Sequence, residues 1–190
     1  MAIRRWLLRL GCCIVATAAS LRYVDQPLAG FFAAHLAHTL AGWWLNRLLA
    51  ALVLFPVVAL LVLFVCGGRL MSGRKLAAWS RPVLLGAWSI VWALAAEFAL
   101  KQIFARLPGG GPHAGQFPSG TATISAAAAT TTWLVAPGWR IPAALLAAFA
   151  SIGVVVTNGH WLSDVIAGAF LGWSIGCMSV PLLETRTVNS

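Results

Sequence analysis

The chain of 190 residues has few charged side chains, since only 9% of its residues are Asp, Glu, Lys or Arg. Acidic residues are the scarcest, with four of them against 13 Lys and Arg. A soluble domain carries about 25% charged and about 45–50% apolar residues, whereas 61% of this chain is hydrophobic. This composition excludes a soluble enzyme, a disordered chain and a disulfide-stapled secreted module. It predicts an integral membrane protein.

Cysteine is also scarce, and the four cysteines show neither metal-ligand spacing nor the spacing of a disulfide framework. All four lie within apolar stretches, where we expect them to pack as small free side chains (Cys12, Cys13, Cys66 and Cys177). The formal net charge of +9 is compatible with nucleic-acid binding. The basic residues, however, are scattered at the ends of apolar runs instead of forming one stripe, so no nucleic-acid partner is expected.

Six apolar runs are candidate membrane-spanning helices, each of which needs about 20 residues to cross a bilayer core of about 30 Å. They cover residues 6–21, 48–67, 83–104, 120–135, 141–157 and 165–183. We therefore predict an all-α polytopic membrane protein with a bundle of six transmembrane helices. Residues 1–190 are expected to form one domain, with the motif-bearing core at residues 45–180. Small residues in the last three runs predict close helix packing.

The basic residues predict how the chain crosses the membrane. With the N-terminus inside, nine of them fall at inside ends and four at outside ends, as the positive-inside rule expects. Both termini are then cytoplasmic, and we expect the protein in the cytoplasmic (inner) membrane of a bacterium. As an alternative, Arg4-Arg5, the following apolar run and Ala16-Thr17-Ala18 form a cleavable signal peptide.

Residues 24–44, between the first two runs, are moderately apolar and contain several aromatic side chains. This stretch predicts a helix on the outer membrane surface, with Trp43 and Trp44 at the lipid boundary. His35 and His38 are expected to be interfacial side chains, and a functional role is the alternative.

Three polar clusters stand out, because polar groups are costly near the membrane core. The first contains Glu97, Lys101 and Arg106, the second is residues 117–121, and the third is residues 158–164. The predicted topology brings all three clusters to the outer face of the membrane.

The third cluster contains a histidine and an aspartate four residues apart, which share one face of a helical turn. A carboxylate at Asp164 that binds one ring nitrogen of His160 leaves the other nitrogen free to attack an electrophile. The alternative role is a helix N-cap, with Ser163 or Asp164 accepting from free backbone N–H groups. The two roles are compatible.

The other two clusters supply groups that bind anions. Pro118-Ser119-Gly120 predicts a helix start whose N–H groups attract an anion, although a simple helix start is the alternative. Lys101 lies four residues after Glu97, so the two form either part of the site or a structural ion pair. Arg106 is placed to bind an anion with two hydrogen bonds. Together the clusters predict a phosphate pocket with a histidine nucleophile.

These motifs resemble those of the type-2 phosphatidic acid phosphatase (PAP2) family of membrane phosphatases, which is related in core fold to vanadium haloperoxidases. The matching segments are Lys101-x4-Arg106-x-Pro108, Phe117-Pro118-Ser119-Gly120, and His160-x3-Asp164 continued by Val165-Ile166-Ala167-Gly168. The resemblance implies that His160 attacks phosphorus to form a phosphohistidine, that Asp164 orients it, and that Lys101 with Ser119-Gly120 holds the phosphate. It implies no metal or other cofactor, because cations and N–H groups stabilise the transferring phosphoryl group.

The chain departs from the family pattern at three positions. Thr121 replaces a histidine that protonates the leaving oxygen, a function worth about 10²–10⁴-fold in rate, and we count Thr121 among the phosphate-binding residues. Pro108 and Val154 stand where the family has arginines, each worth about 10²–10³-fold. Three compensations are open: Arg106 replaces the first arginine, His113 supplies the acid, or a diphosphate leaving group needs less protonation.

Two classes of function are consistent with these residues. The first is a phosphatase acting on a lipid phosphate or diphosphate at the outer face, such as undecaprenyl diphosphate, phosphatidic acid, phosphatidylglycerol phosphate or lipid A. A related phosphotransferase passes the phosphoryl group to a second lipid. The second class is a catalytically inactive protein that binds or transports a lipid phosphate, and a small subunit of a membrane complex is a further alternative. The retained His160–Asp164 pair favours the enzyme.

Overall fold

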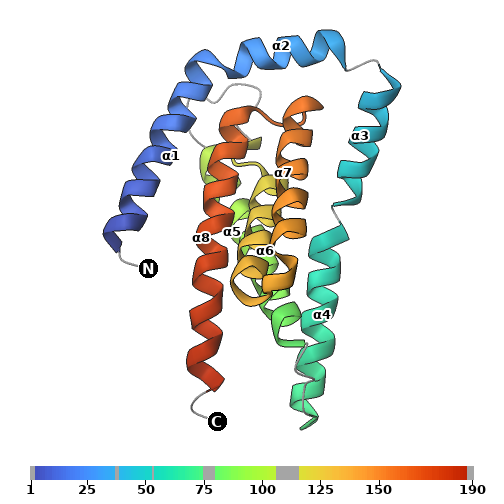
Figure 1. Cartoon of the computed structure of the whole chain (residues 1–190), viewed down its shortest axis with the longest axis vertical. Helices are drawn as coiled ribbons and strands as arrows, with labels where there is room; N and C mark the ends of the chain where they lie inside the picture. The colour runs from blue at the N-terminus through green and yellow to red at the C-terminus, as the bar shows by residue number, and fades with distance from the viewer. Residues whose placement is uncertain (1–2, 37–38, 53, 75–79, 106–115, 188–190) are drawn as a thin grey trace.

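The computed structural model describes residues 3–36, 39–52, 54–74, 80–105 and 116–187 (Figure 1). Within these ranges every regular element is helical, which confirms the predicted all-α class. The elements are α1 (Ile3–Tyr23), α2 (Asp25–His35), α3 (Leu40–Ala51), α4 (Leu54–Met71), α5 (Ser80–Ala105), α6 (Gly120–Val135), the 3-10 turn η2 (Pro137–Trp139), α7 (Arg140–Val156) and α8 (Leu162–Thr187). All four cysteines are free, as predicted.

Four helical stretches of the described chain are long and apolar enough to cross a membrane, namely residues 40–71, 80–104, 137–156 and 162–181. A fifth is possible if α1 and α2, which are bent by 57°, count as one broken span. The polytopic membrane protein is thus confirmed, with four or five such stretches where six runs were predicted. The difference arises because α1 qualifies only together with α2. In addition, α6 has only 16 residues, which makes it about 24 Å long at 1.5 Å per residue.

The helices of the bundle alternate in direction (Figure 1). α5 and α7 end at the upper end of the view, and α6 and α8 begin there. α2 lies across this same end. The segments that precede α6 and α8 are therefore brought to one end of the bundle, beside the end of α5.

α6 is the central helix, packed against α5, α7 and α8. Several of its side chains are completely buried, all of them small (Ala122, Thr123, Ala127 and Thr131). α8 meets this face with glycines one helical turn apart (Gly168, Gly172 and Gly176). A Cβ atom at Gly172 would lie 2.1 Å from the carbonyl oxygen of Thr123. The two backbones therefore approach as closely as small-residue seams in membranes allow.

The N-terminal helix is packed on the bundle. The Trp6 indole N–H donates to Ser174 Oγ at 3.1 Å, and the Arg9 guanidinium lies 4.8 Å from the centre of the Trp173 ring. α1 therefore contributes to the helix packing around α8.

Residues 24–44 form two elements where one surface helix was predicted. α2 ends at His35, and α3 begins after Thr39, whose hydroxyl oxygen accepts from the Gly42 N–H at 3.1 Å. This cap starts a new helix because it satisfies one of the free N–H groups of its first turn. His35 is exposed and its Nδ1 lies 2.8 Å from the Phe31 carbonyl oxygen, while His38 lies outside the described residues.

Exposed tryptophans lie toward both ends of the bundle. Trp43 and Trp44 are exposed near the start of α3. Trp133 and Trp139 are exposed around the connection from α6 to α7, where the Arg140 side chain donates to the Trp133 carbonyl oxygen at 2.7 Å. Tryptophan and arginine are typical of the boundary between lipid and water.

Candidate active site

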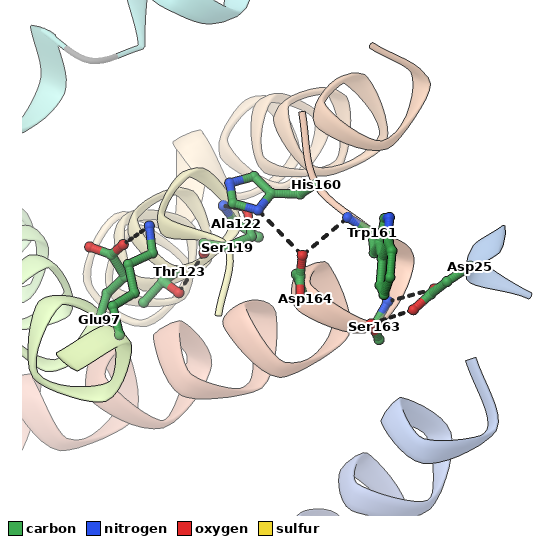
Figure 2. A network of polar contacts seen from close by, with 10 residues as sticks. Asp25, Glu97, Ser119, Ala122, Thr123, His160, Trp161, Ser163 and Asp164 are labelled. Atoms are coloured by element: carbon green, nitrogen blue, oxygen red, sulfur yellow. Dashed lines mark hydrogen bonds and ion pairs between the residues drawn. The ribbon is translucent and has the colours of Figure 1, made fainter. Parts of the chain in front are cut away.

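Polar side chains from α5, α6, α8 and the start of α2 gather at the end of the bundle (Figure 2). The structure brings together, in this region, most of the described residues that the sequence singled out for function. Arg106, Pro108 and His113 lie outside the described residues.

His160 stands on the short loop between α7 and α8, beside Asp164 in the first turn of α8. His160 Nδ1 lies 3.5 Å from Asp164 Oδ2, and Figure 2 shows the other ring nitrogen pointing away from this carboxylate. Within the described residues, the buried Nδ1 atom has no hydrogen-bond partner, since 3.5 Å exceeds the usual length of about 2.7–3.2 Å. Asp164 is thus the group positioned to orient the ring once the contact shortens.

Asp164 also caps its own helix. Its Oδ2 atom accepts from the Trp161 backbone N–H at 3.1 Å, an arrangement that satisfies one of the free N–H groups at the start of α8. The carboxylate oxygen that caps the helix is also the one nearest to His160 Nδ1.

The backbone of Val154 positions the histidine loop from the other side. Its carbonyl oxygen accepts from the N–H groups of Gly159 at 2.9 Å and His160 at 3.0 Å. The Val154 side chain is buried in an apolar cluster with Leu49 and Val165. The position where the resemblance implied an arginine is therefore a core position that also holds His160.

Ser119 joins the start of α6 to the start of α8. Its N–H donates to the Asp164 carbonyl oxygen at 3.1 Å, and its Oγ accepts from the Ala122 N–H at 3.4 Å. Ser119 is fully buried, so its N–H is committed to the protein. The N–H groups of Gly120 and Thr121 precede the first intrahelical hydrogen bonds, and they are the donors that the end of α6 offers to an anion.

Glu97 and Lys101 form an ion pair along α5, which is compatible with both roles that the sequence left open. Glu97 is buried and Lys101 is half-buried. The Glu97 carboxylate also lies against the first residue of α6, because a Cβ atom at Gly120 would be 2.9 Å from Glu97 Oε1. A cation and a carboxylate therefore meet at the end of a helix that attracts anions.

A cavity of about 210 Å³ opens beside this pair. Its polar lining includes Glu97 and Thr121, and most of the remaining lining is apolar, from α4, α5 and α6 (Phe55, Pro56, Leu94 and Ile124). Such a cavity offers an apolar chain a place next to a helix end that attracts anions.

Asp25 is a buried residue of the site region that sequence reasoning missed. One oxygen of its carboxylate accepts from Ser20 Oγ at 2.8 Å and from the Ser163 N–H at 3.1 Å, and the other accepts from Ser163 Oγ. These bonds join the bend between α1 and α2 to the first turn of α8 (Figure 2). No spacing in the sequence relates residues 138 positions apart, so only the tertiary structure reveals this contact.

Comparison with known proteins agrees with the motifs. A family model described as the PAP2 superfamily matches residues 82–187, which is more than half of the chain. The lipid A 1-phosphatase of Porphyromonas gingivalis is 30% identical over 103 residues, which cover 52% of this chain and only 23% of that protein. No solved structure matches significantly. The resemblance found in the sequence is therefore confirmed, and the chain belongs to the PAP2 superfamily of membrane phosphatases.

Proposed function

We propose that this protein removes phosphate from a lipid phosphate or diphosphate through a phosphohistidine formed on His160. The observation that carries the proposal is the placement of His160 and Asp164 beside the end of α6, to which Ser119 ties the first turn of α8. Membership of the PAP2 superfamily supports a phosphomonoesterase. The similarity to a lipid A 1-phosphatase makes a lipid A phosphate one candidate substrate.

The phosphate is expected to bind between Lys101 and the N–H groups of Gly120 and Thr121. Cationic and N–H donors stabilise the charge that spreads over the phosphoryl oxygens in the transition state. Arg106 is proposed to add a bidentate contact. His160 Nε2 then attacks phosphorus while Asp164 holds the proton on Nδ1, and water hydrolyses the phosphohistidine in a second step.

The membrane arrangement is part of the same proposal. α6 is taken to cross the bilayer in the shelter of α5, α7 and α8, so that with α1 the chain makes six crossings. The distribution of basic residues places both termini in the cytoplasm. The site then faces the outside, or the periplasm in a bacterial inner membrane.

The test is phosphate release by purified protein from a panel of lipid phosphates and diphosphates, with and without a chelator. His160→Ala is expected to abolish release and the incorporation of label into an acid-labile phosphohistidine. His35→Ala is the matched control, because His35 is exposed and its Nδ1 lies against the Phe31 carbonyl oxygen of its own helix. Release that persists in His160→Ala contradicts the mechanism, and binding of lipid phosphate without any release by the wild type identifies a binding or transport protein. Transfer of label to a second lipid, instead of to water, identifies a phosphotransferase.

A further inference from the structure

Cleaving an alkyl phosphate requires a proton for the leaving oxygen, because an alkoxide is a poor leaving group. A positioned acid contributes about 10²–10⁴-fold to such a step. Thr121, at the second residue of α6, is no acid near neutral pH. Another group must therefore donate the proton, and its assignment rests on the proposed function.

The three acidic residues with described side chains have different environments. Asp25 and Asp164 are occupied by backbone N–H groups of Ser163 and Trp161. Glu97 instead pairs with Lys101, contacts Gly120 and lines the cavity together with Thr121. Glu97 is therefore the carboxyl group of this set that faces both the anion-binding end of α6 and the cavity.

We propose that Glu97 is the proton donor to the leaving oxygen and the base that activates water. A phosphate monoester has its second pKa near 6 and enters in part as a monoanion with one proton. When its oxygens take the Lys101 ammonium and the N–H groups of α6, two acidic groups meet at one helix end. The Glu97 carboxylate lies beside Lys101 and Gly120, and in the proposed mechanism it accepts the proton of the bound phosphate.

The two chemical steps balance with this single proton. In the first, the bond from His160 Nε2 to phosphorus forms, the bond from phosphorus to the lipid oxygen breaks, and the Glu97 proton passes to that oxygen. The products are a lipid alcohol, the phosphohistidine on His160 and a Glu97 carboxylate. In the second, water attacks the phosphohistidine and gives a proton to Glu97, and the nitrogen–phosphorus bond breaks. The proton then leaves with inorganic phosphate, which restores the initial state.

The experiment compares farnesyl phosphate with farnesyl diphosphate, which share one lipid tail. The diphosphate expels a phosphate anion and needs less protonation than the alkoxide of the monophosphate. In Glu97→Gln, kcat/KM for the monophosphate relative to the diphosphate is expected to fall about 10²–10⁴-fold. The quantity kcat/KM covers only the steps up to the phosphohistidine, so the ratio isolates the first proton transfer.

A second measurement tests the proposal even if Glu97→Gln is partly unfolded. Glu97→Gln is expected to accumulate labelled phosphohistidine from the diphosphate, because the base for the second step is missing; accumulation also shows that the variant is folded. Asp25→Asn is the matched control, since it removes a buried carboxylate outside the cavity. It should lower kcat/KM for both substrates by the same factor.

Each outcome has a defined meaning. If Glu97→Gln lowers kcat/KM equally for both substrates, the proposal is overturned and Glu97 is only a structural partner of Lys101. A wild type that cleaves only the diphosphate also overturns it, because the site then has no donor. If the ratio of kcat/KM for the monophosphate to that for the diphosphate changes in His113→Ala but not in Glu97→Gln, the proton donor is His113. A wild type that cleaves neither substrate, nor any other of the panel, refutes the proposed function itself.

Discussion

The seam between α6 and α8 offers a sharp test of the fold, because one added methyl group there meets only backbone and a short side chain. In Gly172→Ala the new Cβ atom would lie 2.1 Å from the Thr123 carbonyl oxygen and 2.9 Å from the Ala127 nitrogen. Ordinary contact begins near 3.4 Å. The two helices must therefore separate by about 1.3 Å, the difference between 3.4 and 2.1 Å, since backbone atoms cannot rotate away as a side chain can.

Overpacking of this kind costs about 1–3 kcal/mol, and the upper end applies because both neighbours belong to the backbone. For a chain of this size, about 3 kcal/mol lowers the melting temperature by about 6–12 °C. The candidate site lies on the same seam, where the Ser119 N–H binds the Asp164 carbonyl oxygen. A shift near 1 Å is expected to reduce turnover about 10²-fold.

The assay is thermal unfolding in detergent, together with phosphate release. Gly86→Ala on α5 is the matched control, since among the described residues no atom beyond its chain neighbours and its own helix backbone lies within 4 Å of its new Cβ atom. Alanine is the better helix former by about 0.5–1 kcal/mol, so this control should be as stable as the wild type or more stable. If Gly172→Ala melts at the temperature of Gly86→Ala, the close approach of α6 and α8 is wrong.

Further predictions concern single polar groups. Asp164→Asn should lower kcat on the order of 10⁴-fold with a smaller change in KM, because an amide favours the wrong histidine tautomer; steady-state kinetics measures both, and an unchanged kcat would contradict the orienting role. Asp25→Asn should destabilise the protein by about 1–3 kcal/mol, since it disturbs hydrogen bonds to a buried group, and thermal unfolding measures this; equal stability would show that the junction of α2 and α8 does not depend on this carboxylate. Thr39→Ala should cost about 1 kcal/mol through the lost cap of α3, with turnover unaffected when the same preparation is assayed.

The sequence carried much of the fold and part of the site. Composition alone predicted the membrane protein, and the positions of the helices followed from the apolar runs. The spacing of His160 and Asp164 predicted their proximity, because residues four apart share a helical face. The small residues of the last three apolar runs predicted close helix packing, and the glycines of α8 that meet α6 are among them.

Contacts between distant segments could not be predicted in this way. In a chain that is apolar on nearly every face, no hydrophobic stripe indicates which side of a helix meets its neighbours. The central position of α6, the contact of Glu97 with Gly120 and the bond from Ser163 to Asp25 all depend on such neighbours. The predicted surface helix is divided for a local reason, because the Thr39 hydroxyl oxygen caps the start of α3 by accepting from the Gly42 N–H.

The exposed tryptophans have a consequence for the depth of the protein in its bilayer. Trp133 lies 13 residues along α6 from Gly120, about 20 Å at 1.5 Å per residue, and tryptophans hold their position at the boundary between lipid and water. In the proposed membrane arrangement, with Trp133 and Trp139 at one boundary, α6 is shorter than a hydrocarbon core of about 30 Å, so the bilayer has to thin beside α6 for that helix to complete its crossing. Under the proposed function, the thickness of the surrounding bilayer thus sets how far a lipid headgroup must descend to reach His160, and lipids with shorter acyl chains are expected to shorten that descent.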